Sequence, residues 1–168
     1  MVGVATIAGL LAGCAAGPIP AGGRTILVRE KGYRVTAPAG WEPIGSVDAD
    51  VALRQPAVGA GLMAEGTCGG REPRRPLPVL ARHLRFGLRD VEGLEQTPVE
   101  LAGRRGLRSR FTARLDGVPV AVGAVTLEGG RCVYDLVVVA PPGRLPAVAE
   151  DFEAFAGSFE LLAVPEAK

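Results

Sequence analysis

Side chains that could carry out catalysis are few in this chain of 168 residues, and the sequence does not group them. His83 is the only histidine, which excludes a site of several histidines around a metal and leaves acid–base chemistry to one side chain. There is no Gly-x-Ser-x-Gly motif, and Gly59-x-Gly61 opens neither a dinucleotide-binding nor a phosphate-binding loop. The sequence therefore predicts no enzyme activity and no cofactor. We expect His83 to be a solvated residue on the flank of a helix.

Three aspartates could bind a cation or a ligand. Asp48 and Asp50 precede an apolar run, but two acids in a loop supply too few oxygen ligands for Ca²⁺, so we expect an ordinary turn. Asp135 lies inside the apolar segment CVYDLVVVA, where an unpaired carboxylate would be costly. The expected partner is an arginine of a neighbouring strand, one of Arg108, Arg110 and Arg114. A ligand-binding role for Asp135 is the alternative.

The first twenty residues, MVGVATIAGLLAGCAAGPIP, indicate export. Residues 1–12 carry no charged side chain, and as a helix they would span only ~18 Å of a ~30 Å hydrocarbon core. That length fits the apolar region of a secretory signal. The sequence Leu11-Ala12-Gly13-Cys14 resembles the lipobox of bacterial lipoproteins. The resemblance implies that Leu11, Ala12 and Gly13 are recognised by the signal peptidase and that Cys14 is the lipidated first residue of the mature chain.

This assignment divides the chain into four parts. We expect a lipoprotein signal peptide at 1–13, a lipidated cysteine and flexible tether at 14–24, a folded domain at 25–163 and a tail at 164–168. No lysine or arginine precedes the apolar region, which departs from the usual pattern. An ordinary signal peptide, or an N-terminal strand that contains a cysteine, is the alternative. Ala15, rather than aspartate, follows the cysteine, which by analogy with known sorting favours the outer membrane over the inner.

The two remaining cysteines, Cys68 and Cys132, form an even pair in an oxidising compartment. Each lies at the end of an apolar run, so a disulfide between neighbouring strands is plausible. Closing a loop of about 65 residues would stabilise the fold by roughly 4 kcal/mol. A two-cysteine metal site is the alternative, but neither cysteine belongs to a Cys-x-x-Cys motif.

The composition and the apolar periodicity predict one globular domain rich in strands. The 24 glycines and 14 prolines favour many turns, and 48% of residues are hydrophobic. Residues 107–115 alternate between apolar and charged side chains, which is typical of an antiparallel sheet with one covered face. Asp116-Gly117, Gly129-Gly130 and Lys31-Gly32 predict hairpin turns. We expect strands at 25–30, 33–37, 51–54, 58–67, 95–102, 107–115, 118–127 and 132–140, and helices at 78–90 and 145–156.

The order of three motifs resembles the PsbP-like fold. These are Tyr33-x-Val35-x-x-Pro38-x-Gly40-Trp41, the Gly103-x-x-Gly106 turn, and a closing helix with Phe152-x-x-Phe155-x-x-Ser158-Phe159. The resemblance covers residues 25–162. It implies an α+β single domain, an antiparallel β-sheet flanked by helices. Because this fold occurs in proteins of unrelated roles, it implies little chemistry beyond binding or scaffolding.

The best candidate for a functional surface is basic. Residues 71–114 carry eleven arginines against five acids, although the net charge of the chain is only +1. Arg82, Arg85 and Arg89 would share one side of the expected helix and could contact anionic headgroups or an acidic partner. An exported protein without interleaved aromatic residues is not expected to bind nucleic acid. The sequence thus favours a lipid-anchored envelope lipoprotein that binds an envelope protein or a lipid as an accessory module. A carrier of a small apolar ligand or lipid is the alternative.

Overall fold

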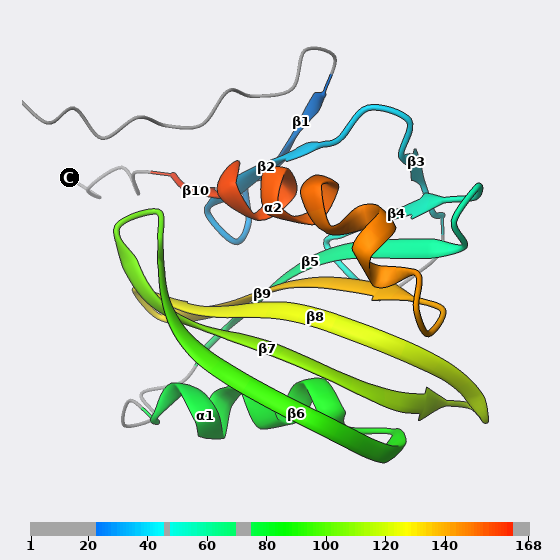
Figure 1. Cartoon of the computed structure of the whole chain (residues 1–168). Helices are drawn as coiled ribbons and strands as arrows, with labels where there is room; N and C mark the ends of the chain where they lie inside the picture. Colours follow the sequence, from blue (N-terminus) through cyan, green and yellow to red (C-terminus); the bar gives the residue numbers. More distant parts are fainter. Residues whose placement is uncertain (1–22, 46–47, 70–74, 163–168) are drawn as a thin grey trace, which may run out of the picture.

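The computed structural model describes residues 23–45, 48–69 and 75–162, and its largest feature is a seven-stranded antiparallel sheet (Figure 1). The strand order is β3-β4-β5-β9-β8-β7-β6, so every neighbouring pair except β5–β9 joins strands that are consecutive in the sequence. The strands are β3 (Glu42–Pro43), β4 (Val51–Gln55), β5 (Ala60–Cys68), β6 (Leu88–Leu101), β7 (Arg104–Leu115), β8 (Val118–Gly129) and β9 (Cys132–Ala140). The antiparallel α+β fold expected from the sequence is confirmed.

Tight turns containing glycine connect β6, β7, β8 and β9. Asp116 and Gly117 have φ angles of 50° and 83°, the left-handed conformation that a two-residue hairpin turn requires. Ala102 and Gly103 form the same kind of turn, with φ angles of 51° and 67°. The hairpins expected from Asp116-Gly117 and from the Gly103 motif are both present. Local turn chemistry therefore fixes the register of the longest strands.

A smaller sheet and the closing helix cover one face of the large sheet. Strands β1 (Arg24–Val28), β2 (Tyr33–Ala37) and β10 (Glu160–Leu161) pair in the order β1-β2-β10. The 3-10 turn η2 (Leu145–Val148) runs into α2 (Ala149–Gly157), which confirms the helix expected at 145–156. Helix α2 lies on one side of the seven-stranded sheet and α1 (Leu77–Leu80) on the other (Figure 1). We call these two sides the α2 face and the α1 face.

The larger core lies on the α2 face. Twenty-one buried residues form one cluster that joins β2, β4, β5, β8, β9 and α2. Tyr33, Tyr134 and Phe159 meet at its centre with ring centroids 5.2–5.5 Å apart. Aromatic rings at such separations contribute beyond their buried area. This cluster fills the space between the sheet and α2.

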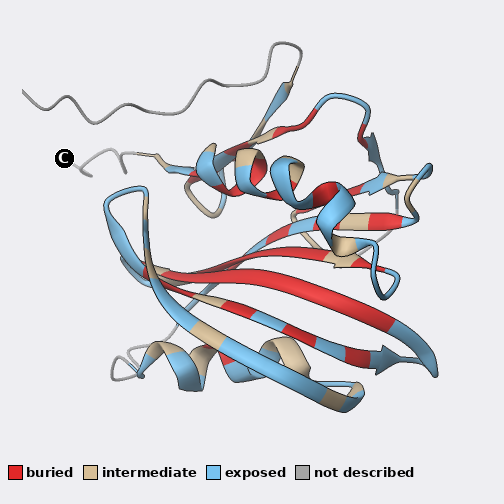
Figure 2. Cartoon of the chain, viewed as in Figure 1, coloured by how far each residue is buried: buried red, intermediate tan, exposed pale blue. Residues whose placement is uncertain are grey.

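On the α1 face the expected helix at 78–90 is wrong. Helix α1 ends after one turn, the 3-10 turn η1 (Ala81–Arg85) follows, and β6 begins at Leu88. Gly87, with φ of 80°, separates η1 from the strand. The spacing of the leucines up to Leu88 is typical of a helix. Leu88 nevertheless belongs to a strand, because residues 88–101 pair with residues 104–115 of β7. Burial colours show the difference: β8 is buried along most of its length and β6 is exposed (Figure 2).

Within the described ranges, no helix has the length and apolar character needed to cross a membrane.

Candidate functional site

A small polar cluster lies on the α1 face, where η1 meets the sheet. His83 Nε2 lies 2.8 Å from Asp135 Oδ2, and Thr126 Oγ1 donates to Asp135 Oδ1 at 2.7 Å. Asp135 and Thr126 are register partners on β9 and β8, and both are buried. The Nδ1 of His83 bonds to the carbonyl oxygen of Leu80. The cluster therefore holds η1 against the sheet.

Two expectations about this cluster are wrong. The partner of Asp135 is not an arginine, because Arg108, Arg110 and Arg114 belong to β7, which β8 separates from β9. They also alternate with Leu107 and Phe111 and so lie on the α2 face. His83 is not simply solvated, since it contacts a buried carboxylate. One indication was present in the sequence: an acid inside an apolar strand needs a partner.

The electrostatics of the cluster make His83 a cation. Its hydrogen bond to Asp135 raises the pKa of His83 to about 9, against the desolvation that lowers it, and the nearby charge of Glu65 adds to the increase. Glu65 is the register partner of Asp135 on β5, so the protonated imidazole lies near two carboxylates. Both ring nitrogens of His83 are engaged with oxygens. A protonated imidazole in this arrangement is a structural contact and a poor general base near neutral pH.

Asp50 has a structural role on the α2 face. Its Oδ2 accepts hydrogen bonds from Tyr33 Oη at 2.9 Å and from the Gly66 backbone N–H at 2.7 Å, and Lys31 Nζ lies 2.7 Å from Oδ1. Burial and the bond to Asp50 raise the pKa of Tyr33 well above its usual range. Asp50 thus joins the β1–β2 hairpin to β5. No group of three or more histidine, cysteine, aspartate or glutamate residues is placed to hold a metal ion in the part of the chain that is described.

The predicted disulfide is present. Cys68 and Cys132 are register partners at the ends of β5 and β9 and are bonded, with their Cα atoms 4.1 Å apart. The lipobox residues Leu11, Ala12, Gly13 and Cys14 lie outside the described residues.

The expected arginine surface takes a different form. Arg82 and Arg85 lie in η1, but Arg89 lies in β6, so the three do not share one side of a helix. Phe86 follows η1, and Leu88 pairs with Leu115, which in turn pairs with Val118. We call this end of the sheet the basic apolar end; it comprises the apolar residues Phe86, Leu115 and Val118 and the cations Arg82, Arg85, Arg89 and Arg114.

The three apolar side chains of this end are unusually exposed. Phe86 is 76%, Val118 61% and Leu115 45% exposed, and no other large hydrophobic residue in the described ranges exceeds 42%. The alternation of residues 107–115 predicts that Leu115 is covered, and its exposure corrects that prediction. The apolar end was not predicted from the sequence, although apolar residues directly flank the Asp116-Gly117 turn.

A cavity of about 350 Å³ lies elsewhere, between β1 and the β3–β4 pair. Its lining includes Ile26, Ile44 and Leu53 together with the charged Arg24 and Asp50. It is therefore not the pocket between sheet and helix that a carrier of an apolar ligand would be expected to have.

Comparison with known proteins shows the fold. No family model matches the chain, and no curated protein matches it. Among solved structures, the cyanobacterial PsbP protein CyanoP of Synechocystis sp. PCC 6803 is similar with a TM-score of 0.64 and 16% identity, covering 90% of this chain and 98% of that one. LpqN of Mycobacterium tuberculosis, described as involved in cell envelope biogenesis, has a TM-score of 0.57 and 11% identity, covering 86% and 87%. The Pseudomonas aeruginosa protein PA94, of unknown function, has a TM-score of 0.51 and 14% identity, covering 87% and 99%.

These similarities confirm the PsbP-like fold expected from the motifs. At 11–16% identity they concern the fold alone.

Proposed function

We propose that this protein is a lipid-anchored lipoprotein of the cell envelope whose folded domain is a non-enzymatic binding module, accessory to an envelope or transport assembly. Leu11-Ala12-Gly13-Cys14 supports the anchor. The Cys68–Cys132 disulfide supports an oxidising compartment outside the cytosol. The similarity in fold to LpqN, which is described as an envelope biogenesis protein, is consistent with this location.

The observation that carries the binding role is the basic apolar end. Large apolar side chains that remain exposed beside several arginines are typical of an interaction surface. The contact between His83 and Asp135 positions this surface, because it fixes the η1 turn that carries Arg82 and Arg85. The domain would therefore present a preformed surface to its partner.

The anchor is tested by mass measurement of the N-terminal peptide of the protein isolated from envelope membranes. The expected result is a peptide that begins at Cys14 and carries acyl chains, and the Cys14→Ser variant should lack them. A peptide that begins upstream of Cys14 without acyl chains would overturn the proposal. Separating inner from outer membranes on a density gradient then tests the preference for the outer membrane.

The binding role is tested by cross-linking in intact envelopes. The triple variant Arg82→Glu, Arg85→Glu and Arg89→Glu should lose the cross-links that the parent protein makes. The matched control is Arg29→Glu, which reverses an exposed arginine in the β1–β2 turn, on the opposite face of the large sheet from η1 (Figure 1). Unchanged cross-links in the triple variant would contradict the role of this surface.

The carrier alternative would use the cavity lined by Ile26, Ile44 and Leu53, whose volume is at the lower limit for ligand pockets. Native mass spectrometry of protein purified from envelopes would detect a bound lipid. A stoichiometric adduct that Leu53→Trp abolishes would favour this alternative.

A further inference from the structure

The charged residues that face each other across the β6–β7 hairpin have opposite signs toward one end and the same sign at the other. Glu95 is opposite Arg110 and Glu100 is opposite Arg105, two pairs of opposite sign. At the basic apolar end, however, Arg89 is opposite Arg114, so two cations face each other. Like charges directly across a strand pair destabilise a sheet.

Part of the charge of this end is compensated within the chain. Arg114 Nε lies 3.3 Å from Asp90 Oδ2, and Arg114 Nη1 donates to the Gly117 carbonyl oxygen. Asp116, in the turn between Leu115 and Val118, is a second acid at this end, so four arginines stand against two carboxylates and the end keeps a net positive charge. An anionic partner would remove the remaining repulsion.

The apolar part of this end projects from two turns. Phe86 lies between η1 and β6, and its backbone N–H donates to the His83 carbonyl oxygen at 2.9 Å. Leu115 and Val118 flank the turn at Asp116 and Gly117. Arginines lie on both sides: η1 carries Arg82 and Arg85 on the α1 face, and Arg89 and Arg114 point to the α2 face. A projecting apolar edge between cations fits the boundary between phosphates and acyl chains.

We propose that the basic apolar end binds the surface of an anionic phospholipid bilayer, with Phe86, Leu115 and Val118 entering the headgroup region and the arginines binding lipid phosphates. This inference rests on the binding role proposed above and names its partner. Guanidinium groups suit phosphate because they donate two parallel hydrogen bonds to it. Each cation close to an anionic leaflet strengthens association about fivefold.

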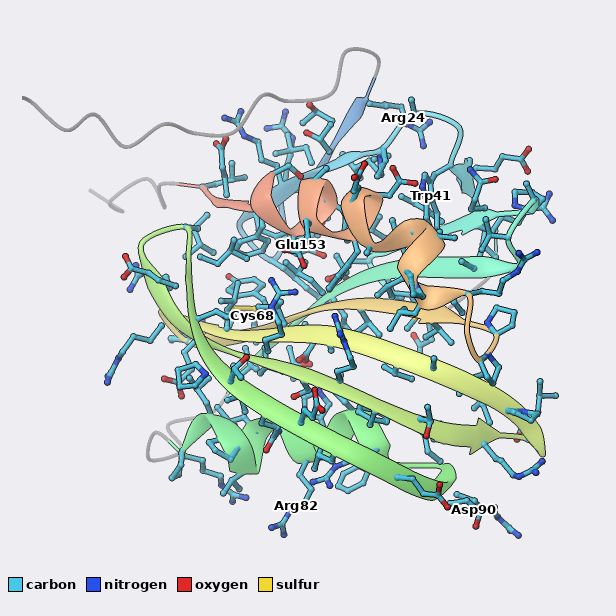
Figure 3. All side chains as sticks on the ribbon, viewed as in Figure 1. Arg24, Trp41, Cys68, Arg82, Asp90 and Glu153 are labelled. Carbon is cyan, nitrogen blue, oxygen red and sulfur yellow. A yellow bond between two sulfur atoms is a disulfide. The ribbon has the colours of Figure 1, made fainter. Side chains whose placement is uncertain are left out.

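The position of this end explains what a second membrane contact would add. Strand β1 begins at Arg24, on the opposite side of the molecule from Arg82 and Asp90 (Figure 3). An anchor at Cys14 would hold the domain near a membrane without fixing its orientation. If fully extended, the segment from Cys14 to Arg24 could span at most about 35 Å. Two contacts would fix the orientation of the domain.

The test uses the chain from Ala15 onward, which keeps every described residue and carries no acyl chain. Its sedimentation is measured with vesicles of phosphatidylglycerol and phosphatidylcholine in equal parts, and with vesicles of phosphatidylcholine alone. We expect binding to the anionic vesicles that weakens as salt increases. Phe86→Ser combined with Val118→Ser should weaken binding about tenfold or more. Arg85→Glu combined with Arg89→Glu should also weaken it at least tenfold, since each reversal removes more than one favourable contact.

A matched pair of controls is available at the other side of the domain. Leu27→Ser and Arg29→Glu change an exposed apolar residue and an exposed cation in the β1–β2 hairpin and should leave binding unchanged. Circular dichroism confirms that each variant is folded. Equal binding by the Phe86 and Val118 variant, equal loss in the controls, or no binding by the parent chain would overturn the inference.

The outcomes separate this inference from the proposed function. A photo-reactive residue at position 86 that cross-links one protein in envelopes, while the parent chain ignores vesicles, would indicate a protein partner and overturn the bilayer contact alone. An acylated native protein with no vesicle binding of its own would leave the anchor standing. If the native protein is never acylated but the chain from Ala15 onward binds vesicles, the bilayer contact would stand and the anchor would be overturned.

Discussion

The two faces of the seven-stranded sheet are stabilised in different ways. On the α2 face, twenty-one buried residues, three aromatic rings in contact and a disulfide between the ends of β5 and β9 form the core. On the α1 face, the buried cluster has six residues, and the short helical segment over the sheet is held through Ala81, Leu84 and the His83–Asp135 contact. The first face determines the fold. The second leaves large apolar and cationic side chains exposed.

The sharpest test of this difference is a matched pair of truncations. Phe155→Ala removes a fully buried ring from the α2 face and should lower the free energy of unfolding by about 4 kcal/mol. Leu84→Ala removes a half-buried side chain from the α1 face and should cost about 1 kcal/mol. Urea unfolding followed by circular dichroism measures both. Equal losses would contradict the division into a large core and a small one.

The disulfide gives the next largest effect. Replacing both Cys68 and Cys132 by alanine should lower the free energy of unfolding by about 3–4 kcal/mol, because the unfolded chain regains the freedom of a long loop. The parent chain in excess reductant is the control and should lose about as much. If unfolding by urea is unchanged in both samples, the bond contributes nothing to the α2 face.

The sequence predicted the β7–β8 hairpin and the helix α2 well because the information for these elements is local. The alternation of residues 107–115, the positive-φ turn at Asp116-Gly117 and the apolar spacing of Phe152 and Phe155 each follow from near neighbours in the chain. The disulfide followed from counting cysteines once Cys14 had been assigned to lipid. The resemblance to PsbP-like proteins predicted how these elements combine into one fold.

The segment that covers the α1 face was predicted poorly because the information that places it is not local. Leu80, Leu84 and Leu88 have helical spacing, yet Leu88 pairs with Leu115 of a strand that begins sixteen residues later. His83 and Asp135 are 52 residues apart, so their contact depends on the folded sheet. The basic apolar end joins residues from η1, β6 and the β7–β8 turn. Only the sheet register brings them together.

The His83–Asp135 contact should make the α1 face sensitive to pH. The folded state raises the pKa of His83 to about 9, so its stabilisation is fully present below the unfolded value of about 6.5 and is lost as pH rises through 9. At about pH 6, His83→Gln should cost about 1 kcal/mol, a figure reduced because the imidazole is partly exposed. The difference between parent and variant should shrink at about pH 10.

Urea unfolding of the parent chain and of His83→Gln across this range checks the prediction, since other titrating groups are common to both. Glu65, Asp135 and Thr126 are the polar groups of the sheet near the imidazole, and the Leu80 carbonyl oxygen is its partner within the helical segment. A constant difference between the two proteins from acid to alkaline pH would show that His83 acts through packing alone.

The smallest effect has the opposite sign, and it distinguishes a surface kept for binding from one kept for stability. Arg89→Thr removes the like-charge pair with Arg114 and should raise the free energy of unfolding by roughly 0.5 kcal/mol, more at low salt. The matched change Arg105→Thr removes a favourable pair with Glu100 on the same two strands and should lower it by about as much. Arg89→Thr should nevertheless weaken binding to anionic vesicles about fivefold, whereas Arg105→Thr should not. An arginine that lowers the stability of the folded chain but strengthens binding to vesicles is accounted for by the binding. Destabilisation of the chain by Arg89→Thr would therefore remove the strongest electrostatic reason for assigning this end of the sheet to a membrane.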